Sequence, residues 1–405
     1  MTRRRRCTER LAAIALASIA VLLGACAERA APALPHSVYV WQRVWDPALR
    51  DAVAESKTFA TSLRVLALQF GTGGATSPDI DWDALRAAGL PVTLVVRIEG
   101  AAAIGPDRLG AFLTALRERG EHLRRNGFAR FDLEIDHDCA TAQLDAYAAL
   151  LARIRADVGG IDTLTITALP AWRDAPALDA VLAQVDASVL QVHAVDDPAQ
   201  GLFDGATAQR RVAVWARRSG AKPFLVALPA YGARLKLDAG GAVVAVESEQ
   251  RLPARSAVTR EVRVDPREIE AWLRELRAQR HPNLAGVAWF RLPRDGDERA
   301  WALRTLRAVV KGQPLQPALR VVTQTGDTGV IDVWLHSEGT LDAPRAALAV
   351  DGRCTAGDGA NGYRLMRGTA WRLEPDRDEP LRAGSTRLVG WLRCDGPAGV
   401  RVAVD

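Results

Sequence analysis

The chain has 405 residues, of which 48% are hydrophobic and 25% are charged, and this composition excludes an intrinsically disordered protein. The formal net charge is +5, but five arginines and one glutamate give the first 25 residues a balance of +4. The rest of the chain is therefore nearly neutral. A near-neutral body does not support a nucleic-acid partner, whose phosphates require a basic surface.

The N-terminal segment, residues 1–26, has the pattern of a bacterial export signal. An arginine run precedes an apolar stretch, residues 11–23, that is too short for a comfortable membrane span. The stretch ends in Leu-Gly-Ala-Cys, which resembles the lipobox of bacterial lipoproteins, and the resemblance implies that Cys26 carries a lipid. With Ala27 rather than Asp after it, the expected location is the outer membrane, facing the periplasm. A plain signal peptide with an incidental Cys26 is the alternative.

After an Ala- and Pro-rich linker at residues 27–36, strand and helix patterns alternate through residues 37–312. Eight strands are expected, each followed by an amphipathic helix, and a hairpin insertion with its turn at residues 238–241 follows the seventh. The expected strands are residues 37–45, 63–70, 91–100, 131–138, 163–170, 188–195, 223–232 and 286–293. Eight such units predict an α/β fold, a (β/α)8 TIM barrel. An open doubly wound sheet is less favoured because no Gly-rich phosphate loop follows the first strand.

Residues 316–405 show a different pattern, with short alternating strands separated by Gly, Asp and Pro. This predicts a second, small all-β sandwich domain. Cys354 and Cys394 both lie in it, and an exported protein permits a disulfide between them. Cys139 is expected to be a small buried apolar side chain. No cysteine pair has the spacing of a zinc site.

The strand expected at residues 131–138, FDLEIDHD, carries the most informative pattern. Its apolar residues fall on one face and its acids on the other. Helices cover the outer face of such a strand, so the acids are expected to point into the barrel. Asp136 and Asp138 lie nearest the C-terminal end, where barrel enzymes hold their catalytic groups. Crowded carboxylates raise one another's pKa, which favours acid catalysis near neutral pH.

The other members of this strand are expected to lie deeper or to face outward. Glu134 is the third candidate catalytic carboxylate, whereas Asp132 is expected to be structural. Buried carboxylates need partners, and Arg97 on the neighbouring strand is the expected one. His137 has the outward register and is expected to be structural. The alternative interpretation of the whole run is an ion-pair network that only fixes the order of the strands.

Polar residues on other strands share the inward register, and aromatic residues cluster near strand ends. On the second strand, Leu66 and Leu68 are expected to face outward and Gln69 inward. Flat aromatic faces at a polar mouth suit stacking on sugar rings, although each aromatic alone is more typical of core packing. Trp41 and Trp45 also lie near a strand end. The candidate substrate contacts are Trp289, Tyr231, Trp172, Gln191, His193, Arg97 and Glu99.

The acidic strand, TITALPAW (165–172), LQVHAV (190–195), FLVALPAYG (224–232) and GVAWFRLP (286–293) together resemble the bacterial domain-of-unknown-function family 3142. More remotely, the chain is similar to family 18 glycoside hydrolases, the chitinase-like barrels. Their fourth-strand signature is Asp-x-x-Asp-x-Asp-x-Glu, and the final Glu is the acid. The resemblance puts Asp138 at that Glu, Asp136 at the Asp before it and Glu134 one step earlier. Phe131 occupies the first Asp position, and Asp138 is one methylene shorter than Glu.

The resemblance implies an envelope glycosidase acting on a polysaccharide or glycan, without metal or cofactor. Asp138 or Asp136 would protonate the leaving oxygen. Glu99, Asp196 or an acetamido group of the substrate would stabilise the oxocarbenium centre. One alternative is a non-catalytic glycan-binding or scaffold lipoprotein on a degenerate barrel. Another is a metal-assisted hydrolase using Asp136, Asp138 and His193, which is disfavoured because the chain has no closely spaced pair of histidines.

Overall fold

A computed structural model of the chain describes residues 34–100, 104–192, 201–238, 240–247, 258–279, 281–396 and 398–403. The predicted export signal with Cys26, most of the linker, His193 and Asp196 lie outside these residues. Among the helices within them, none is both long and apolar enough to cross a membrane.

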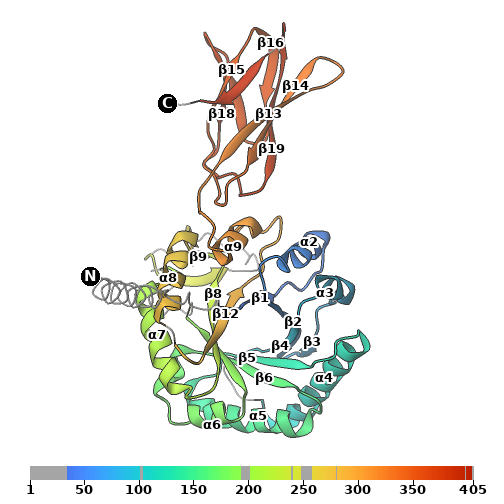
Figure 1. Ribbon diagram of the computed structural model, residues 1–405, viewed down its shortest axis with the longest axis vertical. Helices are drawn as coiled ribbons and strands as arrows, with labels where there is room; N and C mark the ends of the chain where they lie inside the picture. The colour runs from blue at the N-terminus through green and yellow to red at the C-terminus, as the bar shows by residue number, and fades with distance from the viewer. Residues whose placement is uncertain are drawn as a thin grey trace, which may run out of the picture. The chain divides into compact units, whose positions relative to one another are not determined.

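Eight parallel strands of the described residues close into a barrel (Figure 1). They are β1 (His36–Val40), β2 (Ser62–Gly71), β4 (Val92–Ile98), β5 (Asp132–His137), β6 (Thr163–Ala168), β7 (Ala187–Gln191), β8 (Phe224–Pro229) and β12 (Leu284–Phe290). The barrel is closed because β1 pairs with both β2 and β12. The predicted TIM barrel is therefore confirmed.

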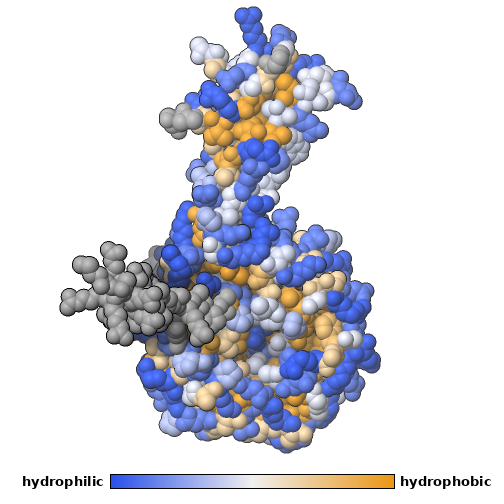
Figure 2. Space-filling model, in the orientation of Figure 1, coloured by the Kyte–Doolittle hydropathy of each residue, from blue (hydrophilic) through white to orange (hydrophobic). Residues whose placement is uncertain are grey.

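Helices cover the outside of the barrel, with polar residues over much of the surface visible in Figure 2. They are α2 (Pro47–Ser56), α3 (Trp82–Ala88), α4 (Pro106–Arg125), α5 (Leu144–Asp157), α6 (Leu178–Ala183), α7 (Gly205–Arg218), α8 (Pro266–Gln279) and α9 (Leu303–Val310). Side chains of Asp46, Asp81 and Asp204 accept a backbone N–H three residues on and so cap α2, α3 and α7. The apolar faces of the helices and strands form one large core.

The predicted facing of residues holds on most strands, and on β2 it holds only in part. Leu66 packs inside the barrel with Tyr39 and Val95, whereas Leu68 packs outside it. The pairing of β2 with β4 shifts register between Leu66 and Leu68. This bulge turns two consecutive residues to the outer side and returns Gln69 to the interior. The expectation that Leu66 faces outward is therefore wrong, and that for Gln69 is confirmed.

The barrel carries one small additional sheet and one short extra strand. The insertion after β8 forms an antiparallel sheet of β9 (Gly232–Leu237), β10 (Val243–Glu247) and β11 (Val258–Arg263). A short strand β3 (Gly74–Thr76) pairs with the end of β2. At the expected turn, Asp238 Oδ1 accepts hydrogen bonds from the backbone N–H groups of Gly240 and Ala242.

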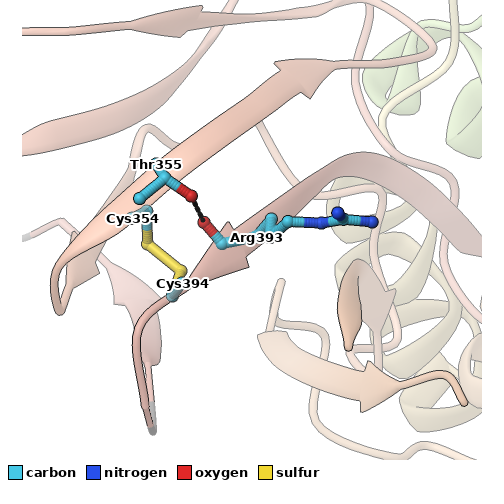
Figure 3. The surroundings of a disulfide bond; sticks show 4 residues. All are labelled: Cys354, Thr355, Arg393 and Cys394. Carbon is cyan, nitrogen blue, oxygen red and sulfur yellow. Dashed lines mark hydrogen bonds between the residues drawn. A yellow bond between two sulfur atoms is a disulfide. The ribbon is translucent and has the colours of Figure 1, made fainter. Parts of the chain in front are cut away.

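The C-terminal residues form two four-stranded antiparallel sheets around a separate core, as predicted. One sheet holds β13 (Leu319–Thr325), β14 (Val330–Ser337), β19 (Thr386–Cys394) and β16 (Cys354–Gly359). The other holds β17 (Tyr363–Met366), β18 (Trp371–Pro375), β15 (Leu348–Asp351) and β20 (Gly399–Val402). The structure contains the expected disulfide between Cys354 and Cys394, which joins β16 to β19 (Figure 3). Next to it, Thr355 Oγ1 donates to the Arg393 carbonyl at 3.3 Å.

Candidate active site

A cavity of about 490 Å³ lies at the C-terminal ends of the barrel strands. Its size is typical of a small-molecule site. The lining combines charged, amide and aromatic side chains. The lining residues are Tyr39, Trp41, Arg43, Gln69, Arg97, Glu99, Gly100, Asp136, Asp138, Thr167, Gln191, Ala227, Tyr231 and Phe290. Among the sequence-predicted residues, the cavity brings together Asp136, Asp138, Arg97, Glu99, Gln191 and Tyr231.

One wall of the cavity is an ion-pair network built on Arg97 of β4. Arg97 Nη1 donates to Asp136 Oδ2 at 2.6 Å, and Arg97 Nη2 lies 2.9 Å from Asp138 Oδ2. Thr167 Oγ1 donates to the other Asp136 oxygen at 2.7 Å, and Gln191 Nε2 donates to Asp138 Oδ1 at 3.3 Å. The Asp138 side chain is 39% exposed, whereas that of Asp136 is almost completely buried. Asp138 is therefore the carboxylate of this pair that a ligand reaches.

The pKa of Asp136 is raised to about 6, mainly by burial and also by the neighbouring Asp138 charge, with Arg97 opposing both. Burial disfavours the charged carboxylate because the protein interior solvates it less well than water does. Arg97 is the expected partner of deep carboxylates, but the structure pairs it with the two aspartates at the mouth. The predicted raising of a pKa within the acidic strand is thus located at Asp136.

Beneath the cavity, Glu134 belongs to a second, fully buried polar layer. Tyr39 Oη donates to Glu134 Oε1 at 2.6 Å, and Thr165 Oγ1 donates to Oε2 at 3.2 Å. Arg64 forms a buried ion pair with the same Oε2. Burial and the Glu134 charge raise the pKa of Tyr39, so this hydroxyl stays protonated as a donor. Glu134 does not line the cavity, and this position disagrees with its predicted catalytic role.

The deepest acid and the outward histidine occupy structural positions. Asp132 pairs with Arg130 at 2.8 Å near the start of β5, away from the cavity. His137 is buried on the outer face, where its ring meets Tyr147 edge-on. The structural roles expected for both residues agree with these contacts, but the expected partnership of Asp132 with Arg97 is wrong.

At the rim, Glu99 is held by the amide of Gln69. Gln69 Nε2 donates to Glu99 Oε1 at 3.1 Å, and Gln69 Oε1 accepts from Arg43 Nε at 2.6 Å. A β-carbon at Gly71 would lie 2.2 Å from Glu99 Oε2, so the missing side chain at Gly71 makes room for the carboxylate. Gln69 and Gly71 thus fix the position of an exposed acid within the cavity.

The opposite wall is aromatic. Around the barrel, β12 stands opposite β5, with three strands between them on either side. Phe290 at the end of β12 makes ring contacts with Trp41, Tyr231 and Tyr39, at centroid separations of 5.1, 5.6 and 5.8 Å. The acidic strand therefore faces an aromatic wall across the cavity.

Three tryptophans of the predicted aromatic set lie in the core outside the barrel. Trp289 is completely buried there, and its Nε1 donates to His36 Nδ1 at 2.9 Å. Trp172 is also completely buried and donates to the Cys139 carbonyl at 3.1 Å. Trp45 packs in the same core. The predicted substrate contacts at Trp289 and Trp172 are wrong, because both side chains point toward the helices.

Sequence reasoning did not select Phe290, Tyr39, Arg43 or Thr167 as ligand contacts. Phe290 and Trp289 are consecutive on β12 and point to opposite faces. Assigning Trp289 to the interior therefore both selected the wrong tryptophan and left out Phe290. Within the described ranges, no group of three or more His, Cys, Asp and Glu side chains is arranged to hold a metal ion. The predicted contact His193 lies outside those ranges.

The fold and this cavity define a (β/α)8 barrel with an acidic and aromatic site at the C-terminal ends of its strands. The chain belongs to the family described as "Domain of unknown function (DUF3142)", which matches residues 88–295, just over half of its length. Residues 320–395, within the β-sandwich, match a second family, "Domain of unknown function (DUF8456)". No significant match was found among curated proteins.

Solved structures with similar folds include spore enzymes and chitinases. The spore cortex-lytic enzyme SleL of Bacillus cereus is 14% identical, with a TM-score of 0.52 over 70% of this chain and 75% of SleL. SleL of Bacillus megaterium QM B1551 is 14% identical, covering 65% and 71%, with a TM-score of 0.49. The chitinase of Chromobacterium violaceum ATCC 12472 is 15% identical, covering 69% and 98%, with a TM-score of 0.47. At this identity the similarity shows the fold alone.

Proposed function

We propose that this protein is a glycoside hydrolase that acts on a polysaccharide or glycan. The observation that carries the proposal is the opposition of the partly exposed carboxylate of Asp138 to the aromatic wall at Phe290. A sugar ring that stacks on an aromatic face presents its hydroxyls and its glycosidic oxygen at the ring edge. That edge then faces the acids of the other wall.

In this proposal Asp138 delivers the proton, which it takes up from solvent, and Asp136 lies behind it as a buried acid with a raised pKa. Asp136 cannot approach a ligand closely, because it is almost sealed and both of its oxygens are hydrogen-bonded. Its raised pKa keeps a substantial fraction protonated at mildly acidic pH. As the glycosidic C–O bond breaks, the leaving oxygen takes a proton from Asp138; water then adds to the anomeric carbon, and the proton that it loses returns to Asp138.

A second carboxylate is needed to stabilise the positive charge at the anomeric carbon or to activate water. Glu99 is the candidate within the described cavity, because Gln69 and Gly71 hold it in place at the rim. Asp196, the other predicted carboxylate, lies outside the described residues. An acetamido group of the substrate is the third source of this stabilisation.

The test is product analysis with soluble oligosaccharides, chitin, and peptidoglycan as substrates. The proposal expects new reducing ends from at least one of them, and their loss in Asp138→Asn. Reducing ends that form equally fast with Asp138→Asn would contradict the assigned acid. The wild-type chain, rather than a variant, tests whether any glycan is cleaved at all.

One observation favours a second candidate function, a non-catalytic glycan-binding barrel. Arg97 lies 2.9 Å from Asp138, so the carboxylate that a ligand reaches is already engaged by a cation of the protein. Asp138 is also one methylene shorter than the Glu of the chitinase-like signature. Saturable binding by the wild-type chain without any product on the same panel would establish this function instead.

We also propose that the mature chain is a lipoprotein of the cell envelope, anchored through Cys26 in the outer membrane. The support is the sequence alone, in which the apolar stretch ends in Leu-Gly-Ala-Cys. Labelled fatty acid is expected to enter the wild-type chain and not Cys26→Ser, and only the wild type should fractionate with membranes. Equal labelling of the two chains would contradict the anchor.

A further inference from the structure

The outer face of the sheet β13–β14–β19–β16 presents an exposed tryptophan between two aspartates. Trp391 on β19 is 37% exposed and belongs to no hydrophobic core of the described residues. Its cross-strand neighbours are Asp332 on β14 and Asp358 on β16, and Asp332 in turn pairs with Gln324 on β13. Paired residues share one face of a sheet. Four adjacent strands therefore carry amide, carboxylate, indole and carboxylate groups in one row.

A second indole lies next to this row. Trp334 is two residues beyond Asp332 on β14, so the two share a face. Its cross-strand neighbours are Val322 and Leu388, and all three side chains are partly exposed and absent from the sandwich core. The Trp334 Nε1 group has no hydrogen-bond partner among the described residues. The face thus joins an aromatic and apolar strip to a row of polar groups.

The carboxylates of the row, Asp332 and Asp358, have no ion-pair partner within 4 Å among the described residues. Arg393, two residues from the exposed tryptophan on β19, nevertheless shares their face. Asp358 Oδ1 accepts a hydrogen bond from the backbone N–H of Gly359 at 2.8 Å, which fixes the side chain and leaves its second oxygen available. Asp332 and Gln324 make no side-chain hydrogen bond within the described part of the chain. Two carboxylates whose oxygens are not engaged in ion pairs favour a ligand with many hydrogen-bond donors or a positive charge.

We propose that this face is a second glycan-binding site, for a polysaccharide of neutral or amino sugars. An indole face packs against the C–H groups of a sugar ring, as aromatic side chains do with apolar surfaces. The flanking carboxylates accept hydrogen bonds from pairs of hydroxyls or from the ammonium of an amino sugar. A protein partner is the less suitable occupant, because a stable protein interface needs about 800 Å² on each side, and this face offers only the polar row and the short strip of Trp334, Val322 and Leu388 beside it.

The site has a consequence for the proposed reaction. A chain that holds a polymer through the sandwich keeps sugar units at a high effective concentration near the barrel cavity. Residues of the sandwich are then expected to affect the use of insoluble polymers and not the cleavage of short soluble ones. The binding itself does not depend on the barrel being a catalyst.

The test is adsorption of the full chain, without its export signal, to insoluble chitin, cross-linked chitosan and peptidoglycan. Wild type is expected to adsorb to at least one, and Trp391→Ala to adsorb roughly tenfold more weakly, as for the loss of one stacking contact. Met366→Ala removes an equally exposed apolar side chain, 41% accessible, from the other sheet and is the matched control. Asp332→Asn keeps the shape of the row and is expected to weaken binding to chitosan most.

Circular dichroism and the unfolding midpoint establish that each variant is folded. Adsorption of Trp391→Ala that equals the wild type would overturn the site, and so would a wild type that adsorbs to none of the polymers. Because the assay measures adsorption and not turnover, an inactive barrel leaves its outcome unaffected. Conversely, cleavage of short oligosaccharides by a wild type that fails to adsorb would support the barrel and exclude the sandwich site.

Discussion

Arg97 Nη1 lies 2.6 Å from Asp136 Oδ2, and the second arm of the same guanidinium reaches Asp138 at 2.9 Å. One cation therefore serves two carboxylates of different exposure, one on β5 and one just after its end. Asp136 is almost sealed and has a raised pKa, whereas Asp138 faces the cavity. The burial and raised pKa of Asp136, next to the exposed Asp138, are the structural basis for the effects of pH and charge expected below.

The first prediction concerns stability and pH. The pKa of Asp136 rises from 3.8 to about 6 on folding, so the folded state binds this proton more tightly than the unfolded state. Its contribution to the free energy of unfolding is largest below pH 3.8 and is lost as the pH rises to about 6. The size of the loss is roughly 3 kcal/mol. Above pH 6 the contribution is constant.

Denaturant unfolding of wild type and Asp136→Asn at intervals between pH 4 and pH 8 measures this effect. The stability of wild type relative to the variant should fall as the pH rises from 4 to about 6 and should then stay level to pH 8. A relative stability that is flat, or that rises with pH, would show that the proton on Asp136 is not held by the folded state.

The second prediction concerns the bridging cation. Arg97→Gln removes the counter-charge of a buried carboxylate, so the pKa of Asp136 should rise further. The free energy of unfolding is expected to fall by about 2 kcal/mol at pH 8, less than for a fully buried pair because Arg97 is 30% exposed. At pH 5 the cost should shrink, since Asp136 is then largely protonated.

The matched control is Arg130→Gln. This change removes a more exposed arginine, which pairs with Asp132 on β5, the strand that also carries Asp136. Exposed pairs contribute little to stability, so the unfolding midpoint should not move. Equal destabilisation by Arg97→Gln at pH 5 and pH 8 would disprove the link to the Asp136 charge.

The third prediction separates two neighbouring aromatics of β12. Trp289→Ala opens a cavity in the outer core and should lower the free energy of unfolding by about 3–5 kcal/mol. Phe290→Ala removes a partly exposed ring of the cavity wall, so it should cost less stability but weaken glycan binding. Denaturant titration and binding measurements on both variants give the comparison. Weaker binding in a folded Trp289→Ala with unchanged binding in Phe290→Ala would reverse the assigned facing.

The fourth prediction tests the placement of Glu99. Gly71→Ala puts a β-carbon where Glu99 Oε2 lies, and the exposed end of this side chain must move away. Product formation is expected to fall by roughly a hundredfold, as for a small displacement of a reacting group, with little change in the unfolding midpoint. Gly73→Ala is the control, because a β-carbon there meets nothing within 4 Å. Equal activity of Gly71→Ala and Gly73→Ala would show that the position of Glu99 does not matter for the reaction.

The barrel and much of its charged wall were predictable from the sequence because polar residues interrupt otherwise apolar strands. On β5 the alternation of acids with Leu133 and Ile135 left only one register that buries the apolar side chains. The same argument placed Gln191 and Arg97 inside the barrel. Where a strand is apolar on both faces, no such signal exists, and Trp289 was assigned to the wrong side among Val287, Ala288 and Phe290.

Two other features depend on backbone and long-range geometry that a sequence pattern does not encode. The bulge near Ala67 shifts the register of β2 without any Gly or Pro to mark it. The pairing of Arg64 with Glu134 joins residues 70 positions apart and leaves Arg97 for the aspartates at the mouth. The pairing of Glu134 with Arg64, and of Arg97 with Asp136 and Asp138, therefore became visible only once the barrel was closed.

The most direct measurement of the central claim is the rate of glycosidic cleavage by wild type and Asp138→Asn, together with the affinity of each for the same glycan. If Asp138 is the proton donor, cleavage should fall by about a hundredfold or more, while the affinity stays close to that of wild type. Cleavage at the wild-type rate by a correctly folded Asp138→Asn variant would contradict the account.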